Sequence, residues 1–170
     1  LDDIFEAHFH NYIVVALALI IYGILFIVIE KRNKNITPKV GSIADITYKT
    51  ALYIGLFQAL SLIPGTSRSG STILGAIIIG VSRVAAAEFS FYMAVPVMFG
   101  ASLIKLLKFG LSFTGTELLI LLVGMATAFI VSVIAIKFLM SYIKKRDFTA
   151  FGYYRIVLGV VIVTYFLLAK

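Results

Sequence analysis

Residues 64–71 have the sequence Pro-Gly-Thr-Ser-Arg-Ser-Gly-Ser, and they interrupt an otherwise apolar region that runs from residue 50 to residue 82. That region has 33 residues and a single charged side chain, Arg68. A continuous helix of this length would extend about 50 Å, well beyond the ~30 Å hydrocarbon core of a bilayer. Proline followed by glycine at the start of the interruption favours a turn there. The sequence therefore predicts two helical arms joined by a polar loop.

Each of the two arms is too short to cross a membrane. The first arm, 50–63, would be about 21 Å long as a helix, and the second arm, 72–81, would be about 15 Å long. We therefore expect a re-entrant helix–loop–helix over residues 44–82, which enters and leaves the bilayer on one side. Its loop, 64–72, is expected to lie inside the membrane.

The composition of the chain is that of an integral membrane protein. Hydrophobic residues make up 61% of the 170 residues and charged residues 14%, against about 45–50% and about 25% in soluble domains. The sequence contains no cysteine, which excludes a disulfide framework, a thiolate metal site and a cysteine nucleophile. The net charge of +7 comes from basic stretches between apolar runs. Such stretches contact lipid headgroups, so we expect no nucleic-acid binding.

Four further apolar segments complete the expected fold. They are 11–29, 84–107, 118–136 and 156–169, the last extended back to residue 153. The most basic loops, 30–49 and 137–147, are expected in the cytoplasm. The predicted fold class is all-α: a polytopic membrane protein in which residues 1–170 form a single transmembrane domain, with four transmembrane helices plus one re-entrant helix pair.

The polar loop combines groups that bind phosphate. Arginine is costly at membrane depth, and its planar fork matches phosphate oxygens. Hydroxyl groups surround Arg68, glycines let a ligand approach the backbone, and the helix expected to begin near Ser71 directs free amides and its positive end toward the loop. The candidate residues are Gly65, Thr66, Ser67, Arg68, Ser69, Gly70, Ser71 and Thr72. Gln58, two turns earlier, either lines the same cavity or bonds to a neighbouring helix.

Other interpretations of the polar residues stay open at this point. Residues such as Ser, Gly and Pro between apolar arms can form an ordinary turn, and a lone arginine can extend to the membrane interface. No GxxxxGK[ST] motif is present, so nucleotide hydrolysis is unsupported. Arg83 and Glu88 are expected to form an interfacial ion pair or to shape the cavity. His8 and His10 point apart at their i, i+2 spacing on a helix, and we assign no metal site.

Several blocks of the sequence, in a fixed order, resemble the undecaprenyl-diphosphatase family, also called bacitracin-resistance proteins. The blocks are Gly55-Leu56-Phe57-Gln58, Pro64-Gly65-Thr66-Ser67-Arg68-Ser69-Gly70-Ser71-Thr72, Gly80-Val81-Ser82-Arg83, Glu88-Phe89-Ser90-Phe91 and Ala94-Val95-Pro96. The resemblance covers essentially all 170 residues and implies the larger, C-terminal part of a typical member. A start at Leu1, with no signal peptide, agrees with this expectation.

The resemblance implies a bacterial plasma-membrane enzyme that hydrolyses undecaprenyl diphosphate to undecaprenyl phosphate and inorganic phosphate. This lipid diphosphate phosphatase would recycle the carrier of cell-wall precursors. The implied fold is an inverted repeat with a re-entrant pair in each half and a site that opens to the outer face. Arg68 would hold the diphosphate, and Ser67, Ser69 and Thr72 would contribute catalytic hydroxyls. A divalent metal, Mg²⁺ or Ca²⁺, is the implied cofactor.

One family motif, of the form E-G-L-T-E-F-L-P-x-S-S-T-G-H, has no match in this sequence. The resemblance ascribes metal binding and the acid–base or nucleophilic role to its glutamates and histidine. We therefore expect the metal ligands and the nucleophile in an upstream segment outside this sequence. The alternative function is a membrane transporter or flippase for an anionic lipid, because broken helices that face an anion are typical of transporters. A structural subunit that contacts a lipid headgroup, and a homo-oligomer, also stay open.

Overall fold

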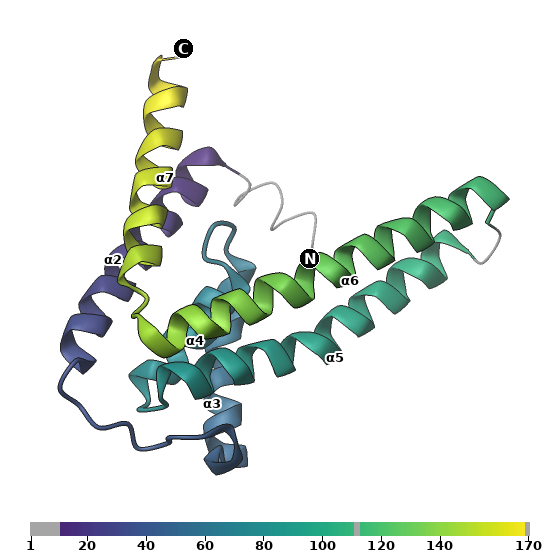
Figure 1. Cartoon of the computed structure of the whole chain (residues 1–170). Helices are drawn as coiled ribbons and strands as arrows, with labels where there is room; N and C mark the ends of the chain where they lie inside the picture. Colours follow the sequence, from purple (N-terminus) through teal and green to yellow (C-terminus); the bar gives the residue numbers. More distant parts are fainter. Residues whose placement is uncertain (1–10, 111–112, 169–170) are drawn as a thin grey trace. The chain divides into compact units, whose positions relative to one another are not determined.

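The computed structural model describes residues 11–110 and 113–168, and the regular elements within these ranges are all helices (Figure 1). They are α2 (Tyr12–Asn33), α3 (Tyr48–Ala59), α4 (Arg68–Ile78), α5 (Arg83–Phe109), α6 (Gly115–Lys145) and α7 (Thr149–Leu168), with two 3₁₀ turns, η1 (Ile43–Asp45) and η2 (Leu60–Leu62). Within the described ranges, four helices are long and apolar enough to cross a membrane: α2, α5, α6 and α7. The predicted all-α class with four spans is confirmed.

Each of the four spanning helices is longer than the apolar segment that predicted it. Helix α2 continues through Lys31 and Arg32, and α6 ends with two lysines, because cations at a helix C-terminus complement its dipole. Helix α7 begins earlier than residue 153, since the Asp147 carboxylate accepts a hydrogen bond from the Thr149 amide at 3.1 Å. Arg155 therefore lies inside this helix rather than at its edge.

Contacts within the chain define two compact units. One unit comprises Leu1–Ser90 and Arg146–Lys170, and the other comprises Phe91–Lys145. In the second unit, α6 exposes apolar side chains along its length, as expected for a helix that is hydrophobic all round. Every contact of the candidate site described below lies within the first unit.

Helices α2 and α7 pack closely through glycine. A Cβ atom built on Gly23 would lie 2.7 Å from the carbonyl oxygen of Gly152, and one built on Gly152 would lie 2.7 Å from that of Gly23. Gly159 lies about two turns further along α7, and a Cβ atom built on it would lie 2.8 Å from the carbonyl oxygen of Ala16. Small residues let membrane helices approach to backbone contact. No larger side chain fits at these positions without separating the helices.

The backbone returns at residue 81 to the place that it left at residue 40. Val40 and Val81 form an isolated parallel bridge. The amides of Lys39 and Val40 donate to the carbonyl of Gly80 at 2.8 and 3.2 Å, and the Ser82 amide donates to the carbonyl of Val40 at 2.9 Å. Because the entry and exit of this segment are hydrogen-bonded to each other, the residues between them make no net crossing of a membrane. This closure supports the re-entrant arrangement expected from the sequence.

The two arms inside this closed segment pack against each other. Helix α3 has 12 residues and α4 has 11, so each is about 18 Å long or shorter and neither spans a ~30 Å core. A Cβ atom on Gly75 of α4 would overlap the side chain of Phe57 of α3. Ile54 of α3 and most apolar residues of α4, among them Ile73 and Leu74, are buried, whereas Ile78 at the end of α4 is exposed. The arms therefore form a compact helical hairpin.

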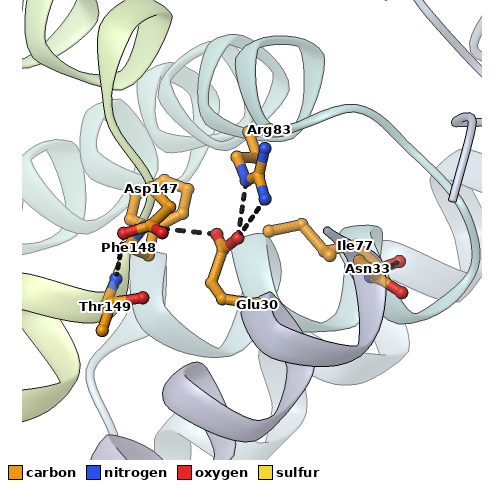
Figure 2. A network of polar contacts seen from close by, with 7 residues as sticks. All are labelled: Glu30, Asn33, Ile77, Arg83, Asp147, Phe148 and Thr149. Carbon is orange, nitrogen blue, oxygen red and sulfur yellow. Dashed lines mark hydrogen bonds and ion pairs between the residues drawn. The ribbon is translucent and has the colours of Figure 1, made fainter. Parts of the chain in front are cut away.

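Glu30, near the end of α2, joins three elements at the base of this hairpin (Figure 2). Its side chain is buried, and its Oε2 atom accepts from Arg83 Nε at 2.6 Å and pairs with Arg83 Nη2 at 2.5 Å. Its Oε1 atom accepts from the Phe148 amide, just before α7, at 3.2 Å. Nearby, Asn33 Nδ2 donates to the carbonyl of Ile77 at 3.4 Å. The C-terminal ends of α2 and α4 and the starts of α5 and α7 therefore lie together.

This network corrects the partner that the sequence suggested for Arg83. The expected interfacial ion pair was with Glu88, five residues away, whereas the observed pair is with Glu30, 53 positions away. The network also places the end of α2 and the starts of α5 and α7 on one side of the membrane. That arrangement agrees with the alternating spans expected from the basic loops.

Replacing Gly152 by leucine should lower the thermal unfolding midpoint of the protein in detergent. The new side chain would have to enter the backbone of α2, and overpacking of this kind costs about 1–3 kcal/mol. Gly124→Leu is the matched control, because a Cβ at Gly124 meets nothing within 4 Å in the described part of the chain. Equal shifts in the two variants would contradict the close approach of α2 and α7.

A double-mutant cycle on Glu30 and Arg83 should show strong coupling. Glu30→Gln leaves a partly buried guanidinium without its carboxylate and should cost about 1–3 kcal/mol of unfolding free energy. Arg83→Met leaves a buried carboxylate and should cost at least as much. The double variant should lose less than the sum of the single losses, as measured by reversible unfolding in detergent. Additive losses would mean that the ion pair contributes nothing to stability.

Candidate functional site

The loop of the hairpin is held by its own hydroxyl groups. The Thr66 side chain is only 2% exposed, and its hydroxyl is within hydrogen-bonding distance of the carbonyl oxygens of Leu60 and Ile63, at 3.1 and 2.8 Å. Ser67 has a φ angle of 69°, a conformation that residues other than glycine rarely adopt and that concentrates at functional sites. Its Oγ atom accepts from the Gly70 amide at 3.3 Å. Ser67 is therefore the N-cap of α4.

Helix α4 begins at Arg68, earlier than the start near Ser71 that the sequence indicated. The cap at Ser67 explains the difference, because its hydroxyl replaces a helical partner for the Gly70 amide and its carbonyl accepts from the Ser71 amide at 3.0 Å. Residues 68–71 thus form the first turn of a helix rather than part of an irregular loop. The remaining amides and the positive end of the helix dipole lie at the loop, as an anion site requires.

Two hydroxyls near the start of α4 face the protein interior. Ser71 is 1% exposed and donates to the hydroxyl of Tyr22 in α2 at 3.1 Å. Thr72 is also 1% exposed, and its hydroxyl lies 2.7 Å from that of Ser90 in α5. With Thr66, three of the predicted hydroxyl groups are therefore engaged within the protein. Their contribution to ligand binding stays a prediction.

The other predicted residues lie closer to the surface of the loop. Ser67 is exposed, Ser69 is partly buried, and their Oγ atoms lie 3.3 Å apart. Arg68, between them, is the first residue of α4 and is partly buried. Gln58 lies in the last turn of α3 and is also partly buried. The structure therefore places Arg68 at the start of α4 between two serines whose hydroxyls lie together, and the catalytic and binding roles of these residues stay predictions.

Gly65 is fitted to α2. Its φ angle is 93°, and a Cβ atom there would lie 2.6 Å from the carbonyl oxygen of Val15 and 2.9 Å from the Val15 Cα. Contact with α2 alone therefore requires glycine at this position, apart from any approach of a ligand. Val15 precedes Glu30 by 15 residues, or about 22 Å along the helix. The loop consequently lies far along α2 from the polar network at the hairpin base, and its depth in the membrane stays a prediction.

A second arginine, Arg155 of α7, reaches the loop and is absent from the residues that the sequence predicted. Its Nη2 atom donates to the carbonyl oxygens of Gly65 at 2.5 Å and Thr66 at 2.9 Å. Its guanidinium lies over the ring of Tyr22, 5.7 Å from the centroid. A signal for it exists: Arg155 is the single charged residue between positions 149 and 168. The rule that an intramembrane arginine marks a site, applied to Arg68, applies equally here.

The described residues around the loop do not form a divalent-metal site. Residues 63–72 contribute hydroxyls, carbonyls and a guanidinium and include no His, Asp or Glu. In residues 11–110 and 113–168 no group of three or more His, Cys, Asp or Glu side chains could hold a metal ion. His8 and His10 lie outside the described residues. The loop therefore presents a guanidinium and hydroxyls, but residues 63–72 supply no carboxylate or imidazole as a general base.

Comparisons with known proteins identify similar chains. A family model described as "Bacitracin resistance protein BacA" matches residues 1–161. An undecaprenyl-diphosphatase of Enterococcus faecalis is 66% identical over 161 residues, which cover 95% of this chain and 58% of that protein. A protein of the same name from Acetivibrio thermocellus is 62% identical, and the match covers 99% of this chain and 62% of that protein. Another from Desulfitobacterium hafniense is 63% identical, and the match covers 97% of this chain and 60% of that protein. The chain spans about three fifths of the length of these curated relatives.

Alanine substitutions at Gly65 and Gly55 should shift stability in opposite directions. Gly65→Ala forces a side chain into the backbone of α2 at a positive φ angle, so the unfolding midpoint in detergent should fall, by the equivalent of about 1–3 kcal/mol. Gly55→Ala lies within α3, where a Cβ meets nothing within 4 Å among the described residues. Its higher helix propensity should stabilise by about 0.5–1 kcal/mol. An unchanged unfolding midpoint in Gly65→Ala would contradict the close contact of Gly65 with α2.

Proposed function

Because this chain belongs to the bacitracin resistance protein BacA family, we propose that it forms the phosphate-binding part of a lipid diphosphate phosphatase. It is a multi-pass protein of the bacterial plasma (inner) membrane. The proposed reaction is hydrolysis of undecaprenyl diphosphate to undecaprenyl phosphate and inorganic phosphate, which would return the lipid carrier to cell-wall synthesis. The names of the similar proteins support this substrate.

The single observation that supports the proposal most is the placement of the loop. Arg68 and Ser67 lie at the N-terminus of a short helix, inside a closed hairpin, about 22 Å along α2 from the polar network at its base. A polyprenyl diphosphate carries its charge at one end of a long apolar chain. Its headgroup would meet the loop at membrane depth, and its tail would lie among apolar helices. Few soluble phosphate esters would reach such a position.

In the proposed mechanism the chain neutralises the charge on the leaving and transferred groups. Phosphoryl transfer depends mostly on positioning and on electrostatic stabilisation of the equatorial oxygens. The Arg68 fork and the free amides at the start of α4 would supply that stabilisation. The hydroxyls of Ser67 and Ser69 would donate further hydrogen bonds to the same oxygens.

The remaining chemistry is assigned to no described residue. A divalent metal, Mg²⁺ or Ca²⁺, is part of the proposal by resemblance, but the loop offers it no set of ligands. The ligands of such a metal, and a general base, would have to come from residues outside the described ranges.

A transporter or flippase is the second candidate. The N-terminus of a short helix placed at membrane depth, as in α4, is also how transporters bind anionic groups. The two functions differ in one product. Incubation of the complete gene product with undecaprenyl diphosphate in detergent should release inorganic phosphate if it is a phosphatase. Movement of the lipid between leaflets of a vesicle without phosphate release would favour transport.

Replacing Arg68 by alanine should reduce the rate of phosphate release from undecaprenyl diphosphate by at least about 100-fold, as for loss of a transition-state donor. Arg68→Lys should not restore the rate, because a point charge does not reproduce the bidentate fork. Ser141→Ala, at an exposed position near the end of α6, is the control and should behave like the wild type. Near-normal turnover in either Arg68 variant would remove Arg68 from the mechanism.

A further inference from the structure

We propose that Arg155 is a positioning residue that holds the backbone of the loop in the orientation needed for phosphate binding. This inference rests on the proposed function for its catalytic consequence. The starting observation is geometric: one nitrogen of Arg155, Nη2, donates to two successive carbonyl oxygens, those of Gly65 and Thr66. These carbonyls immediately precede Ser67, the cap of α4.

The carbonyl groups of Gly65 and Thr66 need a hydrogen-bond donor because they lie beside the proposed phosphate site. Carbonyl oxygens carry partial negative charge and would repel a diphosphate if they turned toward it, whereas backbone amides attract it. Gly65 has no side chain to restrict rotation of its peptide group, and its φ angle is already positive. Arg155 satisfies both oxygens from the side of α7. The amides at the start of α4 are then left to face the ligand.

Arg155 is itself fixed by its neighbours. Its guanidinium lies over the Tyr22 ring, 5.7 Å from the centroid, and the Tyr22 hydroxyl accepts from Ser71 in the first turn of α4. A Cβ atom on Gly70, in the same turn, would lie 3.6 Å from Arg155 Nη1. Tyr22 and Arg155 therefore connect α2 and α7 to both sides of the cap at Ser67.

Packing alone does not explain an arginine at position 155. Its Nε atom is buried and has no hydrogen-bond partner among the described residues, and a buried unsatisfied donor is costly. An apolar side chain would pack against α2 without that cost. What an apolar side chain could not do is donate to two carbonyl oxygens of the loop.

This geometry predicts different effects of lysine substitution at Arg155 and at Arg68. At Arg155 a single nitrogen makes both hydrogen bonds, so an ammonium group can replace it in part. At Arg68 the proposed contact is the bidentate fork, which lysine lacks. We therefore expect Arg155→Lys to retain activity within about tenfold of the wild type, while Arg155→Met loses about 10- to 100-fold in kcat/KM, as for loss of charge-assisted hydrogen bonds.

The experiment compares Arg155→Met, Arg155→Lys and the control Arg146→Met in the complete gene product. Arg146 is an exposed arginine between α6 and α7. Phosphate release from undecaprenyl diphosphate gives kcat/KM for each variant. Hydrogen–deuterium exchange without substrate reports on the backbone of residues 64–71. In Arg155→Met the exchange of these amides should accelerate while α2 and α7 stay protected, and Arg155→Lys should restore much of the protection.

Three outcomes would overturn the proposal. Full activity and an unchanged loop in Arg155→Met would show that the contact is dispensable. Faster exchange throughout α2 and α7 would make Arg155 a packing residue. A protected loop in Arg155→Lys together with activity as low as that of Arg155→Met would indicate direct contact with the ligand. If the wild type itself releases no phosphate, the proposed function fails, and the exchange data still decide whether Arg155 holds the loop.

Discussion

A bilayer core contains no water to hydrogen-bond the backbone, so a chain that turns inside it has to satisfy its own amides and carbonyls. The hairpin between α3 and α4 meets this requirement with side chains. Thr66 serves the carbonyls at the end of the first arm, Ser67 serves an amide of the second, and Arg155 serves the two carbonyls between them. The polar residues of the loop therefore stabilise the turn before any ligand is bound. This explains why the Thr66 hydroxyl, predicted as part of the phosphate site, is engaged by backbone carbonyls of the same turn.

Length and hydropathy were enough to predict the architecture. A 33-residue apolar region with one charge does not fit the bilayer as a single helix, and that conflict alone predicts the hairpin. The bridge between Val40 and Val81, by contrast, has no signal in the sequence, because it depends on backbone hydrogen bonds between distant residues. The partner of Arg83 was unpredictable for the same reason. A local pattern favours Glu88, but the fold brings Glu30 to it.

In the candidate site, too, residues that stand out in the local sequence could be predicted, whereas contacts between distant segments could not. Arg68 and the serines on either side could be predicted from the sequence because they interrupt an apolar run. Arg155 interrupts another apolar run just as clearly, but near its boundary, where an arginine is readily assigned to the membrane interface. Its connection to Gly65 becomes visible only when α7 packs on α2 through glycine. The observed start of α4 at Arg68 also differs from the predicted start near Ser71, because capping by Ser67 depends on the unusual backbone conformation of that residue.

The hydrogen-bonded closure at residues 40 and 81 has a consequence for the orientation of the later helices in the membrane. A segment whose two ends lie together returns the chain to the side from which it left. The direction of α5 and of every later span is then determined by α2 and is indifferent to the length or contents of the intervening hairpin. Substitutions and insertions in the tip of the hairpin, where we propose that the phosphate binds, can therefore accumulate without inverting the later helices.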